Sequence, residues 1–105
     1  MINAKEELLG LLKGKARIKC AYITYGDEGD KDIEYFILKI EYTKDELNDF
    51  LDSLNFNYDN GYGGQELFGT IWLEDDTWCT REEYDGSEWW RHNKIPLIPM
   101  ELYKF

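Results

Sequence analysis

Few residues in this 105-residue chain are of the types that perform nucleophilic or metal-dependent chemistry. His92 is the single histidine, and the two cysteines, Cys20 and Cys79, lie far apart with no activating motif beside them. A zinc site needs four ligands at characteristic spacings, and these three residues do not form such a pattern. We therefore predict no catalytic residue, no metal, no cofactor, and a protein that is not an enzyme.

Carboxylates are the abundant reactive groups, and they give the chain a formal net charge of −10 from 22 acids and 12 bases. The excess is concentrated in residues 41–88, where 14 acids are accompanied only by Lys44 and Arg81. Such a field repels nucleic acid and anionic lipid and attracts basic surfaces. The charge predicts a basic macromolecular partner and no direct nucleic-acid binding; its simpler interpretation is solubility.

The location of the protein is predicted from its cysteines and its first residues. A small secreted domain held by disulfides normally carries more than two cysteines, so Cys20 and Cys79 are expected to be reduced core residues. Residues 1–7 contain acids where a signal peptide needs bases and an apolar run. No apolar stretch approaches the ~18 residues of a membrane span. The expectation is a cytoplasmic protein with no membrane partner.

Hydrophobic periodicity predicts one α+β domain over residues 1–105, with the element order α-β-β-α-β-β-β and an antiparallel sheet. Thr43 and Glu46 have the spacing of a capping box that starts the second helix. The expected helices cover residues 4–12 and the segment after Thr43, and the expected strands cover 16–25, 33–42, 66–74, 77–84 and 88–94. A polar turn is expected at 26–32 and an aromatic loop at 55–65.

The last three strands are predicted to form a meander, because Asp85-Gly86 is a strong signal for a type I′ hairpin turn. If Asp75-Asp76 is the preceding turn, alternation places two sets of side chains on opposite faces. One set is Ile71, Leu73, Trp78 and Trp89; the other is Phe68, Trp72, Cys79 and Trp90, with Arg81, Glu83 and Glu88. Residues 95–99 contain two prolines and are predicted to form an extended flap over the domain.

A resemblance covers about a third of the chain. The segment Gly61-Tyr62-Gly63-Gly64-Gln65-Glu66-Leu67-Phe68-Gly69-Thr70-Ile71-Trp72, followed by Thr77-Trp78 and by Glu83-Tyr84-Asp85-Gly86-Ser87-Glu88-Trp89-Trp90, resembles small acidic proteins of phages and mobile elements of gut bacteria. Among these proteins, the chain is similar in length and acidity to anti-CRISPR proteins, which inhibit type II RNA-guided DNA nucleases. The family has no catalytic motif to carry over.

The resemblance implies a carboxylate array that acts as a DNA mimic in the basic channel of a bacterial nuclease, with aromatic side chains as anchors. The predicted partner is a basic bacterial protein of this class, bound by a monomer or homodimer in the host cytoplasm. The predicted contact residues are Asp45, Asp49, Asp52, Glu74, Asp75, Asp76, Glu82, Glu83, Asp85 and Glu88 for charge, and Tyr58, Tyr62, Trp72 and Trp90 as anchors.

Two other functions fit the same residues. An exposed aromatic sheet face suits a subunit of a phage structure or assembly, in which that face is an oligomer interface. A small hydrolase with a carboxylate pair would need a deep pocket and substrate-orienting groups.

Overall fold

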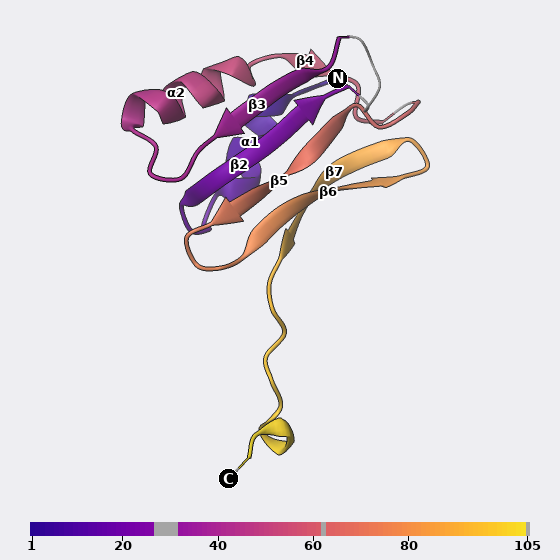
Figure 1. The fold of residues 1–105 in the computed structure, drawn as a ribbon. Helices are drawn as coiled ribbons and strands as arrows, with labels where there is room; N and C mark the ends of the chain where they lie inside the picture. Colours follow the sequence, from indigo (N-terminus) through magenta and orange to yellow (C-terminus); the bar gives the residue numbers. More distant parts are fainter. Residues whose placement is uncertain (27–31, 62, 105) are drawn as a thin grey trace.

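The chain folds into an antiparallel sheet with two helices packed on one of its faces (Figure 1). A computed structural model describes residues 1–26, 32–61 and 63–104. The elements in chain order are β1 (Ile2–Asn3), α1 (Ala4–Leu12), β2 (Ile18–Tyr25), β3 (Glu34–Leu38), α2 (Lys44–Ser53), β4 (Asn57–Tyr58), β5 (Leu67–Leu73), β6 (Trp78–Tyr84), β7 (Ser87–Asn93) and the 3₁₀ turn η1 (Met100–Leu102). The predicted α+β class is confirmed, and β1 and β4 are additions to the predicted order.

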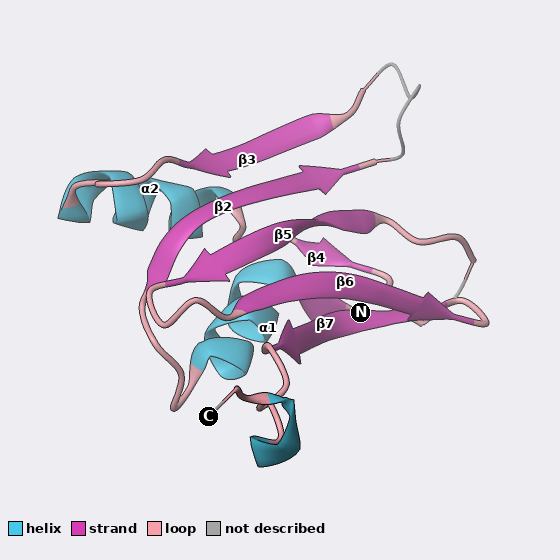
Figure 2. Cartoon of the chain, turned by 60° about the horizontal axis from the view of Figure 1, so that its bottom comes forward, coloured by secondary structure: helices cyan, strands magenta, loops and turns pink. Residues whose placement is uncertain are grey.

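Strand order explains how distant segments meet. Five strands form one sheet in the order β3-β2-β5-β6-β7, and β1 pairs with β4 in a separate two-stranded sheet. The β1–β4 pairing sets Ile2 opposite Tyr58 and so holds the start of α1, which follows β1 directly. The helix-facing side of the large sheet, called the inner face, provides Ile23, Ile71 and Leu73 to a core shared with residues of both helices. Figure 2 shows the five strands of this sheet and both helices from a second direction.

The predicted strand over residues 33–42 is shorter than expected. β3 ends at Leu38, and Glu41 has a φ of 64°, in the left-handed region that interrupts extended backbone. Most of the predicted turn at 26–32 lies in residues 27–31, outside the described residues. The predicted aromatic loop contains β4, and its Phe56 and Tyr58 pack into the core or against it.

The capping box at α2 is confirmed. Thr43 Oγ1 accepts from the Glu46 amide at 3.1 Å, and a Glu46 carboxylate oxygen accepts from the Thr43 amide at 3.1 Å. These two bonds satisfy amides that have no partner within the helix.

Replacing Thr43 by alanine should lower the free energy of unfolding by about 1 kcal/mol, because it removes one partner of this reciprocal pair. Urea denaturation monitored by tryptophan fluorescence measures the change. Thr43→Ser is the matched control, since it keeps the hydroxyl and should stay close to the wild-type stability. Equal losses in the two variants would show that the cap does not stabilise α2.

The turn between β6 and β7 is confirmed as a two-residue hairpin. Asp85 and Gly86 have φ values of 52° and 87°, as a type I′ turn requires, and Tyr84 pairs with Ser87. The Glu83 carboxylate accepts from the Gly86 amide at 3.0 Å. This turn fixes the pairing Arg81–Trp90 farther along the hairpin.

The turn between β5 and β6 corrects the predicted register. The Leu73 amide donates to the Thr77 carbonyl at 2.9 Å, so the loop has three residues, and its last, Asp76, is left-handed with φ 64°. The predicted loop, Asp75-Asp76, has two residues, and the additional residue shifts β6 against β5. As a result Trp72 stands opposite Trp78.

The new register also reassigns the faces, because a shift of one residue moves every side chain of a strand to the other side. Trp78 and Trp89 share the face of Trp72, not that of Ile71 as predicted. Cys79 and Trp90 lie on the inner face with Ile71.

The predicted C-terminal flap is also wrong. Residues 94–104 leave the end of β7 and extend away from the sheet, ending near η1 (Figure 1). We call this segment the C-terminal arm. Its large apolar side chains are between 54% and 95% exposed. Ile95 and Ile98 each precede a proline, which favours extended backbone at both positions.

Candidate functional site

The sheet face opposite the helices, called the outer face, is not packed by either helix. Antiparallel register places on it Cys20, Tyr22 and Thr24 of β2, Tyr35 and Ile37 of β3, Phe68, Thr70 and Trp72 of β5, Trp78, Thr80 and Glu82 of β6, and Trp89, Arg91 and Asn93 of β7. Tyr22, Trp72 and Trp89 are 45%, 44% and 43% exposed. Both helices pack on the inner face, so among the described residues no helix shields this aromatic surface.

The outer face is hollowed at its β2–β5 side. A depression of about 370 Å³ is lined by Tyr22, Thr24, Gly26, Ile33, Tyr35, Phe68 and Gly69. The rings of Tyr22 and Tyr35 meet edge to face with centroids 6.1 Å apart at its wall. A shallow aromatic hollow of this kind fits the side chains of a docking segment.

The predicted acidic residues form three separate groups rather than one array. Asp45, Asp49 and Asp52 lie on α2, which packs beside the edge strand β3. The β5–β6 turn carries Glu74, Asp75 and Asp76, and the β6–β7 hairpin carries Glu82, Glu83 and Asp85. Because successive turns of an antiparallel meander lie at opposite ends of the sheet, the last two groups are separated by the length of β6, roughly 20 Å.

Among the residues that the structure describes, most of these acids have no basic partner. Lys5 contacts Asp52 at 3.2 Å and Arg91 contacts Glu82 at 3.5 Å, and both are exposed pairs of the kind that contribute little to stability. Within residues 1–26, 32–61 and 63–104, the other acids of the three groups make no ion pair. A hydrogen bond from the Thr77 hydroxyl lowers the pKa of Asp75, which keeps this carboxylate charged.

Three predicted contact residues lie in the interior. Tyr58, Glu88 and Trp90 are 1%, 2% and 8% exposed, so they are not available to a partner in this fold. Trp90 is buried because the corrected register places it on the inner face, and Tyr58 is buried because β4 pairs with β1. Trp72 is the one predicted anchor that the structure places on the outer face, and Tyr62 lies outside the described residues.

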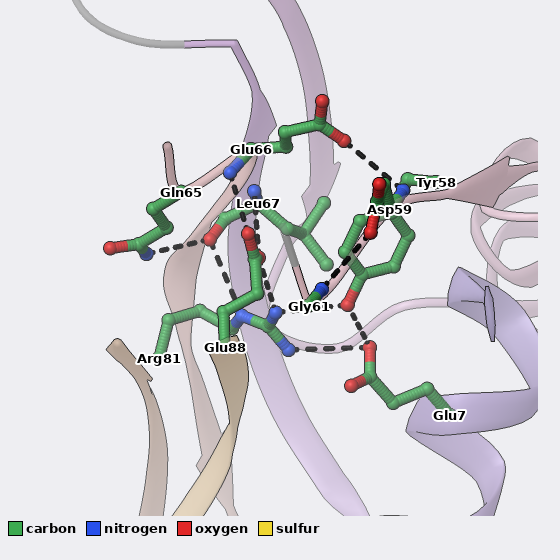
Figure 3. Close-up of polar contacts among 9 residues, drawn as sticks. All are labelled: Glu7, Tyr58, Asp59, Gly61, Gln65, Glu66, Leu67, Arg81 and Glu88. Atoms are coloured by element: carbon green, nitrogen blue, oxygen red, sulfur yellow. Dashed lines mark hydrogen bonds and ion pairs between the residues drawn. The ribbon is translucent and has the colours of Figure 1, made fainter. Parts of the chain in front are cut away.

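The three interior residues surround the guanidinium of Arg81, whose side chain is 2% exposed. Figure 3 shows two of them, Tyr58 and Glu88, together with Glu7 at the guanidinium. Nη2 donates to Glu88 at 2.5 Å and to the Tyr58 hydroxyl at 2.9 Å, and Nη1 contacts Glu7 at 3.3 Å. The Arg81 carbon Cζ lies 5.0 Å from the Trp90 ring centroid, within cation–π range. We call Glu7, Tyr58, Arg81, Glu88 and Trp90 the Arg81 cluster.

The carboxylate of Glu88 also fixes the start of β5. Its two oxygens accept from the amides of Glu66 and Leu67 at 2.7 and 3.0 Å. The Tyr58 hydroxyl donates to Glu7, and burial together with this bond raises the pKa of Tyr58. Each charged group of the Arg81 cluster thus has an opposite charge and hydrogen bonds, which is how a buried ion network is tolerated. The cluster joins α1, β4, β5, β6 and β7, and it serves the fold.

Sequence reasoning placed Arg81 and Glu88 on one face but assigned Glu88 to the surface. The usable signal was the Asp85-Gly86 turn, which sets Arg81 opposite Trp90 and diagonal to Glu88 across the hairpin. The contributions of Glu7 and Tyr58 had no local signal, because they come from more than 20 residues away.

The thiols and the imidazole do not gather into a reactive group. Cys79 is buried on the inner face, and desolvation raises the pKa of its thiol, which disfavours the nucleophilic thiolate. Cys20 belongs to the outer face, and His92 Nε2 lies 2.8 Å from Thr77 Oγ1. In the described part of the chain, no three histidine, cysteine or acidic side chains are grouped so as to hold a metal ion.

Comparison of the chain with protein-family models, curated proteins and solved structures finds no match. Among the described residues, the helices are too short or too polar to cross a membrane.

Proposed function

We propose that this protein is a non-catalytic inhibitor that binds a type II RNA-guided DNA nuclease in the bacterial cytoplasm, as anti-CRISPR proteins do. The observation that carries the proposal is the open outer face, which holds Trp72, Trp78 and Trp89 in a chain of net charge −10. The resemblance of residues 61–90 to small acidic phage proteins supports the same class.

The physical roles of the two features differ. Tryptophan and tyrosine side chains near the centre of an interface supply most of its binding energy. Acidic groups at a rim mainly steer association and exclude nucleic acid. These nucleases hold DNA in a positively charged channel, so a protein with acids at both ends of an aromatic face complements that channel. In this proposal the acids at the two ends of β6 contact different basic regions, and the tryptophans between them exclude water.

Replacing Trp72 and Trp89 together by serine should weaken binding by about 100-fold or more, because two interface anchors are lost. The measurement is calorimetric titration into a panel of guide-loaded type II nucleases, with cleavage of a duplex target as the second readout. Leu9→Ser is the matched control: Leu9 is 44% exposed on α1, away from the outer face.

The contribution of charge to binding is tested separately with the double variant Glu83→Gln plus Asp85→Asn. Glutamine at position 83 keeps an oxygen that accepts from the Gly86 amide. Asparagine at position 85 tolerates the positive φ of this turn residue. We expect a slower association rate whose difference from wild type disappears at high salt. Full cleavage by every nuclease of the panel in saturating wild-type protein, with no heat of binding, would refute the proposed function.

A further inference from the structure

In the described part of the chain, the C-terminal arm and the outer face are two apolar surfaces that no other segment covers. The arm exposes six large side chains in eleven residues, namely Ile95, Leu97, Ile98, Met100, Leu102 and Tyr103. Isolated apolar residues on a surface are ordinary, but a continuous segment of them indicates a site of association. The outer face offers an aromatic surface and a hollow of about 370 Å³.

We propose that the arm of one copy packs on the outer face of a second copy, so that the protein is an arm-exchanged homodimer. The exchange is reciprocal under two-fold symmetry, which buries the same contact twice and closes the assembly at two chains. The proposal does not rest on the proposed function, but both use the outer face, so the arm would have to leave that face before a nuclease binds there.

The geometry favours a second copy over the arm's own sheet. Pro99 has φ −61° and ψ 148°, and both Ile95 and Ile98 precede prolines, so the arm is held extended along its departure from β7. Residues 94–99, which precede η1, reach up to about 20 Å when extended. The five strands of the sheet, spaced at ~4.8 Å, span about 20 Å, so an arm can cross the whole outer face of a neighbour.

The chemistry of the arm determines how it docks. Its two prolines have no amide hydrogen, so it is a poor additional strand at the sheet edge, and its side chains must supply the contact. Its charges also complement the body: Lys94 and Lys104 against Glu101 give +1, whereas the remaining ten bases and 21 acids give −11. Opposite net charge assists the approach of an arm to a second copy.

The test is light scattering of the full chain during size-exclusion chromatography over a range of concentrations. We expect twice the 12.5 kDa chain mass at high concentration. The arm variant Leu97→Ser plus Ile98→Ser and the face variant Trp72→Ser plus Trp89→Ser should each lose at least tenfold in dimer affinity. Leu9→Ser should dimerise as the wild type does. Circular dichroism confirms that each variant is folded.

Mixing the two variants gives the decisive result. The arm of the face variant and the face of the arm variant are both intact, so the mixture should form a heterodimer through one remaining contact, more tightly than either variant pairs with itself. A wild-type chain that stays monomeric at the highest concentration overturns the proposal, whether or not the arm shields its own tryptophans. Dimers that persist in both variants overturn it as well. A monomeric chain that still inhibits a nuclease would leave the proposed function intact.

Discussion

Replacing Arg81 by leucine should lower the free energy of unfolding by about 3–5 kcal/mol, because the carboxylate of Glu88 would then be buried without its counter-charge. Arg81 donates from Nη2 to Glu88 and Tyr58 and from Nε to the Leu67 carbonyl at 3.3 Å. A domain of this size has a total stability of about 5–15 kcal/mol, so the loss is a large share of it. Thermal unfolding should show a decrease in Tm on the order of 20 °C.

Arg91→Leu is the matched control for this experiment. Arg91 contacts Glu82 across the same hairpin, but its side chain is 63% exposed, and the expected loss is below ~1 kcal/mol. The double variant Arg81→Leu plus Glu88→Gln should be less destabilised than the sum of the single changes, since it removes the unpaired charge and keeps an acceptor for the β5 amides. Equal effects of Arg81→Leu and Arg91→Leu would contradict the structural role of the Arg81 cluster.

Replacing Gly69 by alanine should destabilise the protein by about 4 kcal/mol through backbone strain and overpacking. Gly69 lies in β5 opposite Ile23, with a φ of 145° that side-chain-bearing residues rarely adopt. A Cβ there would lie 2.3 Å from the Tyr22 carbonyl oxygen and 2.8 Å from the Ile23 Cα. These contacts are with backbone inside the sheet, so they cannot be relieved by a rotamer change.

Gly10→Ala provides the control, because a Cβ at this position in α1 meets nothing within 4 Å. Alanine should stabilise the helix there by about 0.5–1 kcal/mol. Chemical denaturation of the two variants gives both values. A loss of less than ~1 kcal/mol for Gly69→Ala would show that the strands β2 and β5 separate easily at this point.

The candidate site was predictable only in part. The abundance of acids follows from the sequence, whereas which sheet face is exposed does not. Trp72, one of the four predicted anchors, is 44% exposed on the outer face. The single array of carboxylates was wrong, because the turns that carry Glu74 and Asp85 lie at opposite ends of β6. Glu88 was misassigned because the Arg81 guanidinium that binds it is buried beside Glu7 and Tyr58, which come from distant parts of the chain.

The sequence by itself determined the local structure: the apolar spacing of the helices, the capping box at Thr43 and the type I′ turn at Asp85-Gly86 each depend on neighbouring residues. The tertiary structure decided which residues of β6 and β7 face the helices, because the three-residue loop that ends at left-handed Asp76 sets their register against β5. Two-residue and three-residue hairpin loops are both common, so the sequence of the turn does not by itself select the register. The register is selected by which side chains of β6 and β7 become buried when the strands pair, and this depends on the whole sheet.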